Sequence, residues 1–168
     1  ANIGVSQYDT THLGKPKVDS LKSILMDINP VMEIKVFNEE FSEFYYQFRN
    51  DIAILGFDSM ETRLLAVEAC CKDPIDKPLH IIDGRMGAEH YQQYVITKPT
   101  LSKYNKIWYS DDHGDIEPCN AKATSYCSNM SGSFIANTVR KLITNQPYNS
   151  KFSFNFPTML LEKTKMIG

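Results

Sequence analysis

The stretch Asp51-Ile-Ala-Ile-Leu-Gly-Phe-Asp58-Ser-Met-Glu-Thr-Arg63 decides the fold class of this chain. The apolar run from Ile52 to Phe57 indicates a buried strand, and a helix is expected to begin near Met60. In α/β proteins, ligands bind beyond the carboxyl ends of parallel strands, where a single Asp can hold a magnesium ion that bridges nucleotide phosphates. Asp58 lies at that position. The alternative is that Asp58 only caps the helix, because Asp is a preferred N-cap residue.

Helix and strand patterns alternate on both sides of this stretch. The expected helices cover Pro16 to Asn29, Met60 to Cys71, and Met130 to Ile143, the last ending in Arg140-Lys141. The expected further strands cover Met32 to Phe37, Leu79 to Asp83, Tyr91 to Thr97, and a late edge strand from Lys151 to Pro157. We therefore expect an α/β fold with a Rossmann-like, mostly parallel sheet, flanked by helices and ending in antiparallel edge strands.

Length and charge narrow the class of protein. The 168 residues, 42% of them hydrophobic, fit a single domain over residues 1–168. With 18 basic and 20 acidic residues, the net charge of −2 gives no reason to expect nucleic acid or an anionic membrane as a partner. No apolar run approaches the roughly 20 residues that cross a bilayer, and the N-terminus has no signal-peptide pattern. The expected compartment is the cytoplasm.

The four cysteines, Cys70, Cys71, Cys119 and Cys127, do not have the spacing of a metal site. Cys70 and Cys71 end an apolar-patterned helix and are expected to pack in the core. Cys127 is expected to pack against the following helix. A disulfide between Cys119 and Cys127 is not expected in a reducing cytoplasm.

Short motifs occur in a fixed order along the chain. The first four are Asn2-Ile-Gly-Val-Ser-Gln7-Tyr, Leu13-Gly-Lys-Pro-Lys17, Ile28-Asn-Pro30, and Gly56-Phe-Asp58-Ser with Arg63. Asp83-Gly-Arg-Met-Gly87 and Pro118-Cys-Asn-Ala-Lys follow, ahead of a helix of small residues. In this order and spacing the chain resembles the ThiF/MoeB/HesA group and the related ubiquitin-activating adenylation domains, over about residues 2–145.

The resemblance implies a magnesium-dependent adenylyltransferase. In such enzymes the C-terminal carboxylate of a ubiquitin-like or sulfur-carrier protein attacks the α-phosphate of ATP and forms an acyl-adenylate. By motif, Lys17 is similar to the lysine that contacts phosphate, and Asp58 to the aspartate that holds Mg²⁺. A cation and a metal are suited to stabilising charge on phosphate oxygens. Asn2 and Gln7 would line the nucleotide pocket. Arg63 fits the family's arginine after the metal-binding strand, or it is an exposed helix arginine in a surface ion pair.

Cys119 is the candidate nucleophile that the resemblance adds. It follows the predicted crossover loop, as does the cysteine that takes the acyl group as a thioester in several ubiquitin-like activating enzymes. A thiolate is nucleophilic when its pKa is lowered, and His113 and Lys122 are close enough in sequence to do this. The alternative is an unreactive loop cysteine.

The chain also departs from the family pattern. Its glycines, at 4, 14, 56, 84, 87, 114, 132 and 168, do not form the Gly-x-Gly-x-x-Gly phosphate loop, so the domain is expected to lack its first β-α-β unit. Ser6 replaces the usual arginine, and Val67 replaces a common asparagine. Either a larger protein was cut or a second chain supplies the missing unit, and in both cases we expect a homodimer or a second chain to cover the exposed sheet edge. The alternative function is a non-catalytic structural half, and a Rossmann-type dehydrogenase or methyltransferase explains fewer of the motifs.

Overall fold

The structure, a computed structural model, describes residues 8–39, 51–111, 124–164 and 166–167. The chain divides into two compact units, Ala1–Phe41 and Ser42–Gly168. The expectation of one domain over residues 1–168 stays a prediction. No helix in the described ranges is long and apolar enough to cross a membrane.

In the first unit, the main described element is helix α1 (Lys17–Ile28), which agrees with the predicted helix. A short 3-10 helix, η2 (Thr10–His12), precedes it and begins at Asp9, whose carboxylate accepts a hydrogen bond from the Thr11 N–H at 2.8 Å. The strand predicted from Met32 to Phe37 is wrong, because these residues have no regular secondary structure. Their alternation defines two faces, but a strand also needs a hydrogen-bonded neighbour, and no described strand pairs with them.

The second unit is built on a five-stranded sheet with the order β1-β2-β3-β5-β6. These strands are β1 (Ile52–Leu55), β2 (His80–Met86), β3 (His90–Thr97), β5 (Lys151–Asn155) and β6 (Leu160–Lys163). β1 and β2 are parallel, with Leu55 opposite Asp83, and the other described pairs are antiparallel. A separate two-stranded sheet pairs β4 (Tyr148–Asn149) with β7 (Met166–Ile167).

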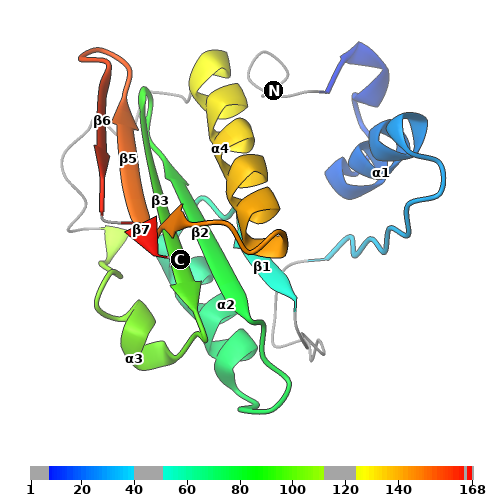
Figure 1. Ribbon diagram of the computed structural model, residues 1–168. Helices are drawn as coiled ribbons and strands as arrows, with labels where there is room; N and C mark the ends of the chain where they lie inside the picture. Colours follow the sequence, from blue (N-terminus) through cyan, green and yellow to red (C-terminus); the bar gives the residue numbers. More distant parts are fainter. Residues whose placement is uncertain (1–7, 40–50, 112–123, 165, 168) are drawn as a thin grey trace. The chain divides into compact units, whose positions relative to one another are not determined.

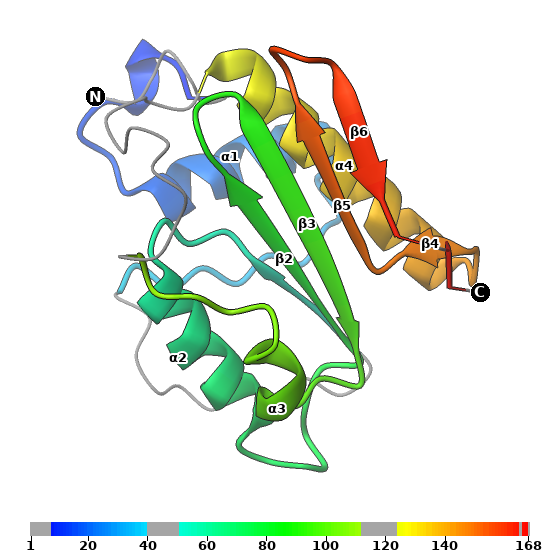
Figure 2. The same cartoon turned by 90° about the vertical axis from the view of Figure 1, so that its left-hand side faces the viewer.

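Helices cover both faces of the five-stranded sheet, as Figures 1 and 2 show. α4 (Ser125–Ile143) lies on one face, over β2 and β3. α2 (Met60–Cys71) and the short α3 (Leu101–Tyr104) lie together on the other. The expected α/β fold with helices on both sides of a sheet, and with antiparallel strands late in the chain, is therefore confirmed.

The parallel part of the sheet is smaller than the sequence predicts. Only residues 87–89 lie between β2 and β3, and the Gly87 N–H donates to the His90 carbonyl at 2.8 Å, which closes a tight hairpin. A parallel pair needs a crossover of a dozen or more residues, so this short turn forces an antiparallel pair. Within the described strands, only β1 and β2 are parallel.

Two late elements also differ from the prediction. β5 is not an edge strand, because a turn after it returns the chain as β6, which pairs with β5 and forms the edge. Asn155 holds this turn, since its side-chain oxygen accepts a hydrogen bond from the Thr158 N–H at 3.0 Å. α4 begins at Ser125 and not at Met130, because Thr124 caps it. Arg140 and Lys141 lie in its last turn, as predicted.

The core between α4 and the sheet is aromatic. Phe134 of α4 stacks on Tyr91 with ring centroids 5.8 Å apart, and it meets Phe152 edge-on at 4.9 Å. Cys127 of α4 is fully buried, and Cys70 of α2 is buried on the opposite side of the sheet. The expected core packing of Cys70 is confirmed, while Cys71 is half-buried.

Candidate functional site

The candidate site lies where the parallel strands β1 and β2 end. β1 ends at Leu55, the chain turns through residues 56–59, and α2 begins at Met60. The N-cap of α2 is Ser59, whose hydroxyl oxygen accepts a hydrogen bond from the Thr62 N–H at 3.0 Å. The alternative that Asp58 caps this helix is therefore wrong.

Asp58 itself is exposed. Within the described residues, no hydrogen bond or ion pair involves its carboxylate. Because Ser59 caps the helix, Asp58 does not have this role, and it stays the candidate metal ligand predicted from the sequence.

Arg63 lies behind this turn and not at its surface. The side chain is buried, and its guanidinium donates to the Leu55 carbonyl at 3.3 Å and to the Phe57 carbonyl. It also forms an ion pair with Asp83 of β2, with an N–O distance of 2.5 Å. An exposed arginine in a surface ion pair is therefore excluded. Arg63 instead forms hydrogen bonds with the backbone carbonyls on both sides of Gly56.

Asp83 is fully buried, and a second arginine pairs with it. Arg85 donates to the same carboxylate from Nε at 2.9 Å and from Nη2 at 2.7 Å. Burial alone would lower the pKa of Arg85, but the Asp83 charge more than offsets this, so the pKa is raised and the side chain stays charged. The Tyr104 hydroxyl also donates to Asp83, at 3.1 Å. Burial, with a further contribution from Asp83, raises the pKa of Tyr104 and keeps this donor protonated.

The segment after α3 is attached to the first residue of α2. The Trp108 indole N–H donates to the Met60 carbonyl at 2.9 Å, and the Met60 N–H donates to the Asp111 carboxylate at 3.2 Å. The side chains of Glu61 and Asp111 are hydrogen-bonded through a shared proton, and this lowers the pKa of Glu61. Acidic groups therefore meet the N-terminus of α2, where the helix dipole favours negative charge.

A magnesium site made only of protein ligands is not present in the described ranges. No three acidic, cysteine or histidine side chains there are grouped so that they could hold a metal ion. Mg²⁺ in nucleotide sites is commonly held by one or two carboxylates together with substrate phosphates and water. One exposed carboxylate, Asp58, fits that arrangement.

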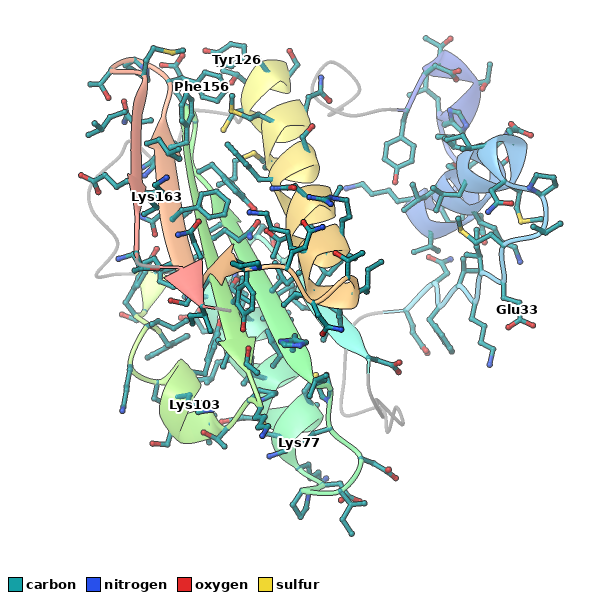
Figure 3. The ribbon with its side chains drawn as sticks, in the orientation of Figure 1. Glu33, Lys77, Lys103, Tyr126, Phe156 and Lys163 are labelled. Atoms are coloured by element: carbon teal, nitrogen blue, oxygen red, sulfur yellow. The ribbon has the colours of Figure 1, made fainter. Side chains whose placement is uncertain are left out.

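The side chains labelled in Figure 3 include some at each end of the sheet. Lys77 and Lys103 lie at the end away from the β2–β3 turn, and their ammonium groups donate to backbone carbonyls. Tyr126 and Phe156, also labelled, lie at the end near the β2–β3 turn, with ring centroids 4.8 Å apart. Tyr126 donates to Glu89 in that turn, which fixes the start of α4 at the same end of the sheet as Asp58.

The structure does not test the other residues predicted from sequence. Lys17 is exposed at the start of α1, in the first unit. Asn2, Gln7 and Cys119 lie outside the described residues. Their roles stay predictions.

Sequence reasoning missed the buried cluster of Asp83, Arg85 and Tyr104. The motif Asp83-Gly-Arg85 contained a usable signal, because residues two apart on a strand point to the same face. Two opposite charges on one face of an apolar strand indicate a buried ion pair. The partner Arg63 was not visible in the sequence pattern, because it comes from a helix 20 residues earlier.

The fold defines an α/β protein whose candidate site lies beyond the carboxyl ends of two parallel strands. The sequence profile of the ThiF family matches residues 6–167, so the chain belongs to the ThiF family. No curated protein sequence is significantly similar to the chain.

One solved structure with the same fold is the crystal structure of selenomethionine PaaA. The superposition has a TM-score of 0.66 and 15% sequence identity, and it covers 98% of this chain. It covers 60% of the PaaA chain, so the present chain spans less than two thirds of the length of PaaA.

Proposed function

We propose that this chain takes part in the ATP-dependent adenylation of the C-terminal carboxylate of a ubiquitin-like or sulfur-carrier protein. A carboxylate oxygen attacks the α-phosphorus of ATP, pyrophosphate leaves, and an acyl-adenylate forms. Family membership supports this class of reaction. The observation that carries the proposal is the exposed Asp58 carboxylate beyond β1, on a turn whose carbonyls Arg63 holds.

Each proposed residue has a separate task. Asp58 would hold Mg²⁺, which bridges phosphate oxygens and offsets the charge that builds on them. Lys17 would neutralise phosphate, and Asn2 and Gln7 would line the nucleotide pocket. Because positioning dominates phosphate chemistry, a carboxylate on a fixed turn suits this task better than one on a loose loop. ATP use fits the cytoplasmic compartment expected from the sequence.

The phosphate-binding glycines would come from a further segment that pairs with β1. β1 is an apolar strand without charge or proline, and among the described strands only β2 pairs with it. Ile54 on β1 is 49% exposed. Parallel strands are normally covered on both sides, and edge strands usually carry protective charges. We therefore propose that a segment outside residues 1–168, from the same protein or from another chain, supplies this unit and pairs with β1.

Cys119 would act after adenylation. Its thiolate would attack the carbonyl carbon of the acyl-adenylate, the bond to AMP would break, and a thioester would remain. Incubation with ATP and a carrier protein would then give an adduct that Cys119→Ala cannot form and that hydroxylamine releases.

A non-catalytic structural half is the second candidate. Ser6 in place of the usual arginine and the absence of Gly-x-Gly-x-x-Gly favour it. The two candidates differ in whether the protein binds Mg²⁺-ATP.

Calorimetric titration of Mg²⁺-ATP into the protein separates them. The matched variants are Asp58→Ala and Glu68→Ala, since Glu68 is an exposed carboxylate on the neighbouring helix. The adenylation proposal expects binding by the wild type and by Glu68→Ala, and loss of binding in Asp58→Ala. If the folded wild type does not bind, the chain is an incomplete or structural half, and the adenylation proposal fails for it by itself.

A further inference from the structure

Asp83 connects two segments that both reach the Asp58 turn. It is fully buried, and its two carboxylate oxygens accept hydrogen bonds from Arg63, Arg85 and Tyr104. These donors come from α2, β2 and α3, so a single carboxylate joins three elements.

The first connection runs through Arg63. Its guanidinium is shared between Asp83 and the carbonyls of Leu55 and Phe57. Phe57 immediately precedes Asp58. The Asp83 charge therefore fixes the guanidinium, and the guanidinium fixes the backbone that presents the Asp58 carboxylate.

The second connection runs through the segment after α3. Tyr104 donates to Asp83, and Arg85 donates to the Ile107 carbonyl at 2.9 Å. From there, Trp108 and Asp111 hold the carbonyl and the N–H of Met60. Both connections thus end within two residues of Asp58.

The charge of this cluster makes Asp83 hard to replace. Two arginines and one aspartate are buried together, which leaves one excess positive charge, since +2 and −1 give +1. Arg85 also lies over the Tyr94 ring at 4.5 Å, which partly compensates it. Without the Asp83 charge, the two guanidiniums would repel each other in a poorly solvated interior.

We propose that Asp83 is a positioning residue that sets the geometry of the Asp58 turn through Arg63 and the Tyr104–Asp111 segment, and so controls Mg²⁺ binding without contacting the metal. In the same way, Arg63 acts through the backbone of the turn and not by touching the nucleotide. This inference rests on the proposed function and extends it.

The test combines Asp83→Asn with two measurements. Hydrogen exchange followed by mass spectrometry reports the mobility of residues 55–61 and 104–111. Titration of MgCl₂ at fixed ATP, followed by calorimetry, reports the metal requirement. We expect faster exchange in both segments with unchanged exchange in α4, and a rise of about tenfold or more in the half-saturating Mg²⁺ concentration, as for other outer-shell partners of a metal.

Gln93→Leu is the matched control. Gln93 is equally buried in the same sheet, but its side chain bonds Tyr91 and Thr138 on the α4 face. This variant should lose stability yet keep the wild-type Mg²⁺ requirement and the wild-type exchange of residues 55–61. If the two variants change the Mg²⁺ requirement and the exchange of residues 55–61 equally, Asp83 has only a general structural role and the proposal is overturned.

Tyr104→Phe keeps the test decisive if Asp83→Asn does not fold. It removes one hydrogen bond to Asp83 and leaves every charge in place. The proposal expects a smaller change in the same direction, and wild-type values in both measurements would overturn it. If the wild type does not bind Mg²⁺-ATP, the proposed function fails, while the exchange measurement still decides whether Asp83 orders the turn.

Discussion

The two faces of the central sheet are built from different chemistry. Under α4 the contacts are aromatic, with Phe134 against Tyr91 and Phe152, and the buried polar groups are neutral. Under α2 and α3, the buried carboxylate of Asp83 lies among guanidiniums. Apolar contacts are not directional, whereas ion pairs with hydrogen bonds fix orientation. The charged face is therefore the one that orders the turn beside the candidate site.

The largest expected effect is on the charged face. Arg63→Met leaves the Leu55 and Phe57 carbonyls and one Asp83 oxygen without this donor, so it should destabilise the fold by about 3–5 kcal/mol, at roughly 1–3 kcal/mol for each unsatisfied buried group. Urea unfolding measures this. Arg140→Met, on the exposed part of α4, should change stability by less than about 0.5 kcal/mol. A similar small loss for Arg63→Met would remove the distinction between the faces.

The aromatic face should respond to the loss of packing. Phe134→Ala opens the space between α4 and the strands and should cost about 3 kcal/mol. The Mg²⁺ requirement should not change, because Phe134 contacts no residue of the Asp58 turn in the described structure. A stability loss with an altered Mg²⁺ requirement would contradict the assignment of separate roles to the two faces.

Alkaline pH should lower the free energy of unfolding through Cys70, which is buried in α2. Burial raises the pKa of Cys70 from 9.0 to about 11, so the folded state disfavours the thiolate. The stability linked to this thiol is complete below pH 9 and is lost as the pH rises through 11, by about 3 kcal/mol in all, because the two pKa values differ by about two at 1.36 kcal/mol per pKa unit. Urea unfolding at several pH values measures the slope. The slope should be shallower in Cys70→Ala, and an unchanged slope would exclude this thiol as its cause.

The smallest expected effects come from two glycines beside or within α4. A Cβ at Gly84 would lie 3.0 Å from the Tyr91 hydroxyl and 3.2 Å from Ile135, so Gly84→Ala should cost about 1 kcal/mol. A Cβ at Gly132 would meet nothing within 4 Å, and Gly132→Ala within the helix should stabilise by about 0.5–1 kcal/mol. Thermal unfolding of both variants checks the opposite signs, and equal signs would contradict the close packing at Gly84.

Local patterns predicted several elements well. The apolar spacing of α1 and α2 and the continuous apolar run of β1 gave their type and nearly their bounds, because each pattern reflects burial of one element. Strand pairing was harder. The direction of β3 follows from the length of a three-residue turn, residues 87–89, and the position of β5 follows from a hairpin that adds β6.

The candidate site also contains residues that the local sequence pattern predicts and residues that depend on strand pairing. Asp58 could be placed from its position after an apolar strand, since that is a local feature. The buried state of Arg63 could not, because it depends on Asp83, which is brought beside it by the parallel pairing of β1 and β2. Ser59 and Asp58 are adjacent residues suited to capping, and only the backbone geometry shows that Ser59 is the cap.

The most direct test of the central claim is metal-directed cleavage of the backbone. Fe²⁺ replaces Mg²⁺ in the presence of ATP, ascorbate and hydrogen peroxide generate hydroxyl radicals at the bound iron, and mass spectrometry locates the cut sites. The account predicts ATP-dependent cleavage next to residue 58 that disappears in Asp58→Ala and persists in Glu68→Ala. Cleavage elsewhere, or cleavage near residue 58 that survives in Asp58→Ala, would contradict a nucleotide-bound metal at this turn.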